Sequence, residues 1–440
     1  MPDSIDWSAA HAEALDLLTR YLRIDTSNPP GNEAPAARFL GALIEAEGVP
    51  TEYIETQPGR EVLVARLPGD GSARPLMLCN HTDVVPVEGD FWTVPPFEGV
   101  VRDGRIYGRG AIDMKGAGVM QLLAFLLAKR QRLRLRRDIV FCAVPDEETG
   151  SRWGMEWLCA HRPDLVDVEF ALCEGGTGIS DFAGRPSRLF NVATTEKEMC
   201  PLILTVTGTP GHASRPHADN SAVRLAEAIV RLAHWNRGIT FTTETRAYIE
   251  AVTEAGLLPS GAPAEVIPEA LRDAPDLLAG FLNTLNVTVV HAGIKSNVVP
   301  ARSEARIDCR LLPGESPEAW RQQVVAYLDD PRVEVTHATD EPAGQPGVAS
   351  ADTELFRVIE DVVRDAMEDA LVLPAVSTVG TDNRFLTPRG VAAYGFIPAL
   401  FSAEERAGFH AHDEFITVEN LQLGCELTYE IVRRLSASPS

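Results

Sequence analysis

Strand-like apolar runs recur through the first 175 residues, and helical segments separate several of them. The runs are EVLVARL, PLMLCN, DIVFCAV and VEFALC, with helical patterns after Lys115 and Ser151. Strands that alternate with helices predict an α/β domain whose mixed, largely parallel sheet is flanked by helices. Two helices are expected before the first run, near 8–23 and 34–47, on either side of the turn segment SNPPG.

A different organisation begins near Thr195. Strands at 202–208, 286–293, 303–312 and 333–338, with helices at 218–232 and 317–328, give the order β-α-β-β-α-β. This is the split βαβ motif of a small α+β domain, and residues 239–285 interrupt it as a long elaboration. The α/β pattern then resumes, with a helix near 353–367, strands at 371–376 and 391–398, and a last helix from Val418. We therefore expect one domain split into 1–195 and 341–440 around an inserted domain at 196–340.

Charge and composition exclude several classes of protein. The formal charge of −23 argues against nucleic acid and anionic membranes as partners. The start lacks a basic region followed by an apolar core, and no segment approaches eighteen uncharged apolar residues, so a soluble cytoplasmic protein is expected. The seven cysteines include no CxxC pair and several lie in apolar runs, which indicates buried, reduced thiols.

Polar side chains follow the apolar runs at the points where strands are expected to end. These are His81 and Asp83, Asp113 after a Gly-rich turn, the adjacent Glu147 and Glu148, and Glu174. Because the ends of parallel strands meet at one edge of a sheet, these residues should converge on one crevice. His410 and His412 precede the final helix and can supply a second imidazole.

This set of side chains suits metal ions. Two imidazoles with three carboxylates favour zinc or a similar divalent ion, and the carboxylates are too many for one tetrahedral ion. A bridging carboxylate would make a two-metal site, with ions roughly 3.5–4 Å apart. Asp83 is placed to hold the second ring nitrogen of His81. Since adjacent side chains point to opposite sides of an extended chain, one of Glu147 and Glu148 can bind metal while the other acts as a general base.

Eight motifs stand in an order that resembles the two-zinc aminoacyl hydrolase family of acetylornithine deacetylase, succinyl-diaminopimelate desuccinylase, aminoacylase and glutamate carboxypeptidase. They are HTDVVP, GRGAIDMKG, PDEETG, CEGG, GTPGHAS, NVVP, VGTDNRF and HAHDEF. The resemblance implies that Asp113 bridges the metals, that Glu147 is the general base, that Asp83 orients His81, and that the Asp113–Met114 peptide is cis. The implied metal ligands are His81, Asp113, Glu148, Glu174 and His410. His410 is preferred to His412 because the family's ligand lies four residues before a Glu, here Glu414.

The same resemblance assigns the inserted domain as a lid that often forms a dimer. His212 matches a residue that stabilises the oxyanion, often from the partner subunit, and Asn297 matches a second contact. Arg310 resembles the residue that holds a substrate carboxylate, with Arg306 as a rival. Gly380 and Thr381 match substrate contacts, and Asp382 and Arg384 are weaker candidates beside them.

The expected function is metal-dependent hydrolysis of an amide bond in a small substrate with a free carboxylate. A carboxypeptidase or dipeptidase with two Zn²⁺, replaceable by Co²⁺ or Mn²⁺, is preferred, and an N-acyl-amino-acid deacylase is the alternative. A catalytically inactive binding or assembly module is a remote possibility. The glycines of YGRGAIDMKGAG also suggest a dinucleotide-binding oxidoreductase, but an Asp and a Lys interrupt that fingerprint. A homodimer through the lid is possible.

Overall fold

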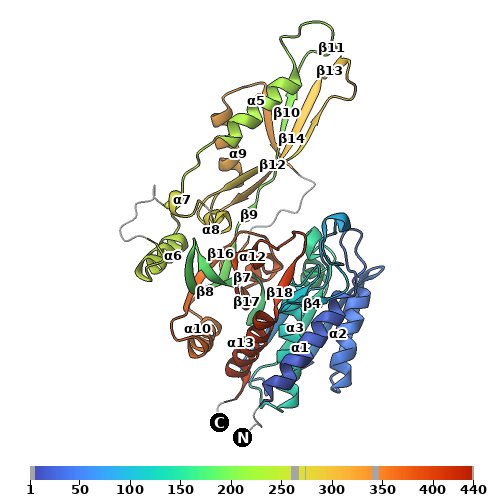
Figure 1. The fold of residues 1–440 in the computed structure, drawn as a ribbon, viewed down its shortest axis with the longest axis vertical. Helices are drawn as coiled ribbons and strands as arrows, with labels where there is room; N and C mark the ends of the chain where they lie inside the picture. Colours follow the sequence, from blue (N-terminus) through green and yellow to red (C-terminus); the bar gives the residue numbers. More distant parts are fainter. Residues whose placement is uncertain (1–4, 259–266, 273, 339–345, 439–440) are drawn as a thin grey trace. The chain divides into compact units, whose positions relative to one another are not determined.

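The computed structural model describes residues 5–258, 267–272, 274–338 and 346–438. The chain forms two compact units (Figure 1). Unit 1 comprises residues 1–195, 347–377 and 381–440, and unit 2 comprises residues 196–346 with 378–380. The expected boundary at 340 to 341 lies outside the described residues.

Unit 1 is built on an eight-stranded sheet with the order β1-β2-β6-β3-β7-β17-β8-β16. Its centre is parallel, because β3 pairs in parallel with β6 and β7, and β17 pairs in parallel with β7. The pairs β1–β2, β2–β6, β7–β8 and β8–β17 are antiparallel, so the sheet is mixed as expected. The strands are β1 (Thr51–Gln57), β2 (Arg60–Leu67), β3 (Leu76–His81), β6 (Ile139–Val144), β7 (Phe170–Phe182), β8 (Arg185–Glu196), β16 (Leu371–Ser377) and β17 (Ala392–Phe401).

Helices cover both faces of this sheet because the central strands are apolar on both sides. Odd and even residues of β3 and β6 enter two separate hydrophobic clusters. The larger cluster packs against α1 (Trp7–Leu22), α2 (Ala34–Ala46), α3 (Lys115–Arg130), α10 (Glu354–Ala366) and α13 (Val418–Ser436). The smaller cluster packs against α4 (Met155–His161) and α11 (Asn383–Leu386).

A small antiparallel sheet brings the end of the chain beside the turn that precedes α3. Its order is β18-β5-β4, from β4 (Val100–Arg102), β5 (Arg105–Tyr107) and β18 (Phe415–Thr417). The short helices η1 (Gly89–Phe91) and α12 (Ala403–Arg406) precede segments of this region. The pairing of β5 with β18 places residues 410–414 next to residues 108–113, which are distant in sequence.

Unit 2 has the β-α-β-β-α-β order that the sequence predicts. Its antiparallel sheet has the order β12-β14-β10-β15, with β9 (Glu198–Met199) paired to β14. The elements are β10 (Leu202–Thr207), α5 (Ser221–Ala233), β12 (Thr284–Ala292), β14 (Arg302–Leu311), α9 (Pro317–Leu328) and β15 (Val333–His337). A two-stranded sheet joins β11 (Gly211–His212) to β13 (Val298–Val299). In the elaboration, the described residues form α6 (Thr243–Glu254), α7 (Ile267–Ala270) and α8 (Pro275–Ala279).

Two expectations from composition can be compared with the structure. All seven cysteines lie in the described ranges, are buried and form no disulfide, as expected. Among the described helices, none is long and apolar enough to cross a membrane.

Candidate metal centre

Asp113 lies between two groups of ligand-type side chains. Its Oδ1 is 3.0 Å from Nε2 of His81, and that nitrogen is 3.3 Å from Oε1 of Glu174. Its Oδ2 is 3.1 Å from Nε2 of His410, and that nitrogen is 3.3 Å from Oε2 of Glu148. Within each group the ligand atoms lie within 4.8 Å of one another. One carboxylate that faces two imidazole and carboxylate pairs has the geometry of a bridge between two ions.

A carboxylate from the end of the chain fixes the Asp113 turn. Glu414 is fully buried and accepts hydrogen bonds from the backbone N–H groups of Gly110 (3.0 Å), Ile112 (2.7 Å) and Asp113 (3.1 Å). Its charge is balanced by Arg109, whose Nη1 lies 2.8 Å away. The Asp113–Met114 peptide is cis, as the resemblance implied. Glu414 therefore links the position of Asp113 to the loop that carries His410.

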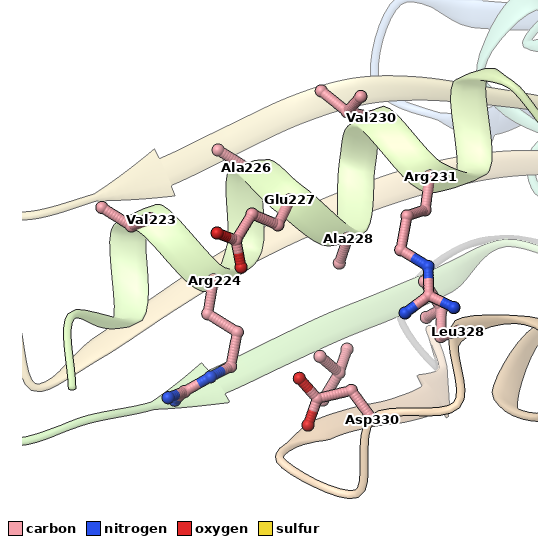
Figure 2. Close-up of a pocket in the computed structure, with 10 residues that line it drawn as sticks. Val223, Arg224, Ala226, Glu227, Ala228, Val230, Arg231, Leu328 and Asp330 are labelled. Atoms are coloured by element: carbon pink, nitrogen blue, oxygen red, sulfur yellow. The ribbon is translucent and has the colours of Figure 1, made fainter. Parts of the chain in front are cut away.

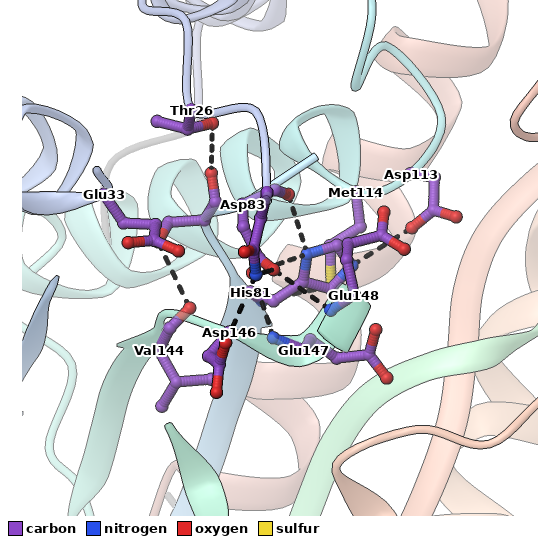
Figure 3. Close-up of polar contacts among 12 residues, drawn as sticks. Thr26, Glu33, His81, Asp83, Asp113, Met114, Val144, Asp146, Glu147 and Glu148 are labelled. Carbon is purple, nitrogen blue, oxygen red and sulfur yellow. Dashed lines mark hydrogen bonds and ion pairs between the residues drawn. The ribbon is translucent and has the colours of Figure 1, made fainter. Parts of the chain in front are cut away.

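Asp83 holds His81 mainly through its backbone. The Nδ1 of His81 lies 3.0 Å from the carbonyl oxygen of Asp83 but 3.6 Å from its Oδ1, which is too long for a hydrogen bond. The carboxylate accepts hydrogen bonds from the backbone N–H groups of Glu147 (3.1 Å) and Glu148 (3.0 Å) instead (Figure 3). Burial favours its neutral form, but His81 and these hydrogen bonds lower the pKa of Asp83 below its ordinary value. Asp83 thus contacts both the His81 strand end and the Glu147 turn.

Glu147 and Glu148 diverge for a reason other than the one expected from sequence. They begin the 3-10 turn η2 (Glu147–Thr149), which follows Asp146 in the left-handed conformation at φ 75°. The expectation of an extended chain here was wrong. Figure 3 shows the two side chains leaving the turn in different directions. Glu148 faces His410 and belongs to one candidate ligand group, whereas Glu147 belongs to neither group of the described residues.

Glu174 also differs from its expected setting. Its strand does not end there, because β7 continues to Phe182. The pairing of β7 with β17 shifts register at this point: Cys173 pairs with Gly395 and Thr177 with Ile397, so four residues of β7 oppose two of β17. Such a bulge re-aims side chains next to a site, and it places Glu174 beside His81.

Electrostatics in this region favour a bound cation. Burial, together with the charge of Asp113 and against the effect of His81, raises the pKa of Glu174 to about 8. Burial and neighbouring carboxylates also raise the pKa values of Glu147 and Glu148. Hydrogen bonds to Asp113 and Glu148 raise the pKa of His410 to about 10. Divalent ions would keep these carboxylates ionised and displace protons from the imidazoles. The buried Oε1 of Glu148 has no hydrogen-bond partner among the described residues, which leaves an oxygen for a metal.

The structure separates the remaining predicted residues between the two units. Thr381 is buried in unit 1, and a Cβ added at Gly175 would approach its Cγ2 to 3.3 Å, so it lies close to the Glu174 bulge. Gly380 groups with unit 2, as do His212, Asn297 and Arg310. His412 is exposed and stacks on Phe91, with ring centroids 5.3 Å apart, so the structure brings His410 rather than His412 to Asp113.

Sequence reasoning missed the residues that hold the candidate ligands in place. In the sequence, Glu414 was used only to prefer His410 to His412 as a ligand. Its hydrogen bonds to the Asp113 turn were not predicted. The buried side chains of Asn28, which donates to Asp83, and Arg60, which donates to Asn28, were also missed. The segment SNPPG was the available signal for Asn28, because a turn with two prolines and a glycine places its neighbours rigidly.

Comparison with family models decides the family. A model for Peptidase family M20/M25/M40 matches residues 77–434, which is more than half of the chain. The chain belongs to this family. M20 members are metal-dependent hydrolases of amide bonds, and both this class and the fold expected from the motifs are confirmed.

Relatives of this M20 chain include deacylases and peptidases. Aminoacylase-1 of Sus scrofa is 29% identical over 431 residues, which cover 97% of this chain and 96% of that protein. Probable carboxypeptidase S-like 2 of Dictyostelium discoideum is 28% identical over 380 residues, which cover 83% of this chain and 72% of that protein. The fold is shared with the metallo-carboxypeptidase Sso-CP2 from Sulfolobus solfataricus (TM-score 0.72, 21% identity, covering 96% of this chain and 98% of that one). It is also shared with the dipeptidase Dug1p from Saccharomyces cerevisiae (TM-score 0.73, 14% identity, covering 99% and 98%).

Proposed function

We propose that this M20 chain is a zinc-dependent hydrolase of an amide bond in a small substrate with a free carboxylate, of the carboxypeptidase or dipeptidase type. The observation that carries the proposal is Asp113, whose two oxygens each face one imidazole and one further carboxylate. The residues that would hold two ions are His81, Asp113 and Glu174 on one side and Asp113, Glu148 and His410 on the other. When bound, such ions polarise a carbonyl and lower the pKa of a water molecule.

Glu147 is the residue that we assign to proton transfer. Asp83 holds its backbone N–H, so the position of Glu147 relative to the ligands is fixed. Its side chain is close enough to Glu174 and Glu148 for both to raise its pKa, but it pairs with neither. As a carboxylate it takes a proton from the attacking water, and as the acid it returns that proton to the leaving nitrogen.

A second candidate function is deacylation of N-acyl amino acids. The observation that favours it is the match to aminoacylase-1 along 97% of the chain, whereas the match to the carboxypeptidase S-like relative covers 83%. Both reactions hydrolyse an amide beside a carboxylate, so the same ligand set and general base serve either one. Only the group on the acyl side differs.

A substrate panel with and without chelator tests this function. We expect about two zinc ions per chain and chelator-sensitive release of a free amino acid from dipeptides or from N-acyl amino acids. Preference for dipeptides supports the first candidate, and preference for N-acyl amino acids supports the second. Metal content is measured by elemental analysis and product by amine detection. Cleavage that persists fully after the metal has been removed would contradict the proposal.

The geometry of unit 2 supports a homodimer that shares its active sites. His212 and Asn297 lie together, because β11 pairs with β13 and the N–H of Ala213 donates to the carbonyl of Asn297 at 3.1 Å. The backbone N–H of Ser214 donates to Nδ1 of His212 at 3.2 Å. The neutral imidazole therefore carries its proton on Nε2, where it can donate to an oxyanion.

Arg310 lies near the end of β14 that is farther from this pair, in the five-stranded sheet of unit 2. His212 and Asn297 lie beyond Arg302, at the start of β14, while Arg310 is near its end. Eight residues of strand at ~3.3 Å each separate Arg302 from Arg310 by roughly 26 Å. The carboxylate and the scissile carbonyl of a small substrate are only a few bonds apart, so one copy cannot supply both contacts. If both contacts serve one substrate, they come from two copies. In this copy Arg310 pairs with Asp308, with Nε to Oδ1 at 2.8 Å, and a substrate carboxylate would compete with that partner.

An exposed face of α5 is a suitable surface for the second copy (Figure 2). Val223 and Val230 are more than half exposed, and Ala226 lies between them on the same face of the helix. They border a cavity of about 630 Å³ that also includes Leu328 and Val333. An apolar stripe at this helical spacing is suited to packing against the same stripe of another copy.

Mixing two inactive variants tests the shared site. His212→Ala and Glu147→Ala are each expected to be nearly inactive, and an isolated hybrid dimer is expected to recover about half of the activity of a wild-type dimer, because one of its two sites is intact. Hybrid formation is followed by two affinity tags and activity by turnover per isolated hybrid. The control adds Val223→Glu and Val230→Glu to both chains, which should give monomers by light scattering and no recovery. Demonstrated hybrids without recovery would refute sharing.

A further inference from the structure

A buried polar network lies behind the ligand groups and is not used in the chemistry above. Three carboxylates, Glu33, Asp83 and Asp146, are at most 2% exposed, and the guanidinium-bearing Arg60 is 8% exposed beside Glu33 and Asp146. Figure 3 shows Glu33 and Asp146 on the side of Asp83 away from Asp113. Burying three carboxylates beside one guanidinium is costly unless each group has several hydrogen-bond or ionic partners. The neutral side chain of Asn28 belongs to the same network, and its contacts show how the charged groups are connected.

The side chain of Asn28 joins the two loops that carry the catalytic residues. It is 1% exposed, and its Nδ2 lies 2.9 Å from Oδ2 of Asp83, 3.3 Å from Oδ1 of Asp146 and 3.0 Å from Oγ1 of Thr149. Asp83 follows the His81 strand, and Asp146 and Thr149 flank Glu147 and Glu148. The backbone N–H of Asn28 donates to the carbonyl of Val84 at 2.9 Å, so Asn28 is itself held on the Asp83 side.

Arg60 completes this bridge from the start of β2. Its Nη2 donates to Oδ1 of Asn28 at 3.0 Å, and its Nη1 contacts Asp146 and lies 3.1 Å from Oε1 of Glu33. Gly31 leaves the space for the guanidinium, because a Cβ there would lie 2.2 Å from Nη2. The segment SNPPG therefore supplies the amide of Asn28 and the room for Arg60. Asp146 also accepts from the N–H of Trp153 at 2.9 Å, which closes the turn from the other side.

We propose that Asn28 and Arg60 are positioning residues, which hold the Glu147–Glu148 turn against Asp83 and thereby fix the general base and one metal ligand relative to His81. The proposal rests on the proposed function for the roles of Glu147 and Glu148, but the contacts that it uses do not depend on the substrate. Asp83 accepts from the N–H groups of Glu147 and Glu148, and Asn28 is the side chain that ties Asp83 to the rest of the turn.

Removing the Asn28 amide should loosen one turn and leave the sheet intact. In Asn28→Ala we expect amide hydrogen exchange of residues 146–151 to become at least about tenfold faster, while exchange of β6 stays unchanged, both in the presence and absence of Zn²⁺. We expect kcat to fall about 10–100-fold with KM changed less than about threefold, and Zn²⁺ affinity by chelator competition to fall by a similar factor. Exchange and Zn²⁺ affinity still report on the proposal if no substrate is found.

Two further variants separate positioning from space filling. Asn28→Asp has the same size but puts a third carboxylate against Asp83 and Asp146, so it should impair kcat at least as much as Asn28→Ala. Arg60→Lys keeps the positive charge but loses the planar guanidinium, which donates to several acceptors at once. It should therefore speed amide exchange in residues 146–151 as Asn28→Ala does, with a smaller fall in kcat. The control is Arg38→Ala, which removes an exposed arginine that pairs with Glu61, the neighbour of Arg60 in sequence, and should behave as wild type. Unchanged exchange at 146–151, exchange that rises equally in β6, or an Asn28→Asp variant better than Asn28→Ala would overturn the proposal.

Discussion

Replacing Glu147 with alanine is expected to lower kcat by about 10³-fold while leaving about two metal ions per chain. The physical reason is that Glu147 is a member of neither candidate ligand group, so its loss removes the proposed proton acceptor without removing a ligand. Steady-state kinetics and elemental analysis of the same preparation measure both quantities. Glu147→Gln should behave alike, because an amide fills the space but cannot accept the proton.

The exposed Glu156 on α4 provides the matched control for this result. Glu156→Ala removes a carboxylate nine residues away and should retain wild-type turnover. A Glu147→Ala enzyme that keeps more than a tenth of wild-type kcat would show that another group accepts the proton. Loss of one ion from Glu147→Ala would show instead that Glu147 is a ligand.

Asp113→Ala is expected to abolish binding of both ions, whereas Glu174→Ala should abolish tight binding of only one. The difference follows from the two oxygens of Asp113, which face His81 and His410 separately, while Glu174 belongs to the candidate group of His81 and not to that of His410 among the described residues. Metal stoichiometry after dialysis should therefore be about zero for Asp113→Ala and about one for Glu174→Ala. Both variants should lose at least about 10³-fold in kcat, since both ions act on the reacting groups.

Asp167 is a suitable control for these metal measurements. It is exposed and pairs with Arg74 at the surface, so Asp167→Ala should retain both ions and normal activity. An Asp113→Ala variant that still holds one ion tightly would contradict the bridging assignment. Equal loss of ions from Asp113→Ala and Glu174→Ala would mean that the two positions bind cooperatively rather than independently.

The residues of the two candidate groups could be selected from the sequence because each one is tied to a local pattern. His81 ends a fully buried strand, and the Glu147 turn follows another, so the parallel pairing of β3 with β6 brings the two segments to one edge of the sheet. Glu174 was found for a partly wrong reason, since a bulge within β7 rather than the end of the strand turns it toward His81. The CEGG motif therefore identified Glu174 correctly as a neighbour of His81, although the strand was wrongly expected to end there.

The supporting contacts could not be predicted in the same way. Glu414 binds the N–H groups of a turn about 300 residues earlier, and Asn28 reaches a turn about 120 residues later. No periodic pattern of apolar residues and no constant spacing along the sequence marks such contacts. They are decided by which loops the sheet brings together, so they appear only when the topology is known. The same holds for the carbonyl of Asp83, because no side-chain pattern reports where a backbone oxygen points.

The late position of Glu414 and His410 has a consequence for biosynthesis. During translation His81, Asp113 and Glu174 emerge from the ribosome long before residues 410–414, which follow the whole of unit 2. A chain stalled before residue 410 therefore lacks both one imidazole of the ligand set and the carboxylate that fixes the Asp113 turn. The proposed centre is completed only once residues 410–414 have been added, so by this proposal a chain that stops before them does not cleave amide bonds.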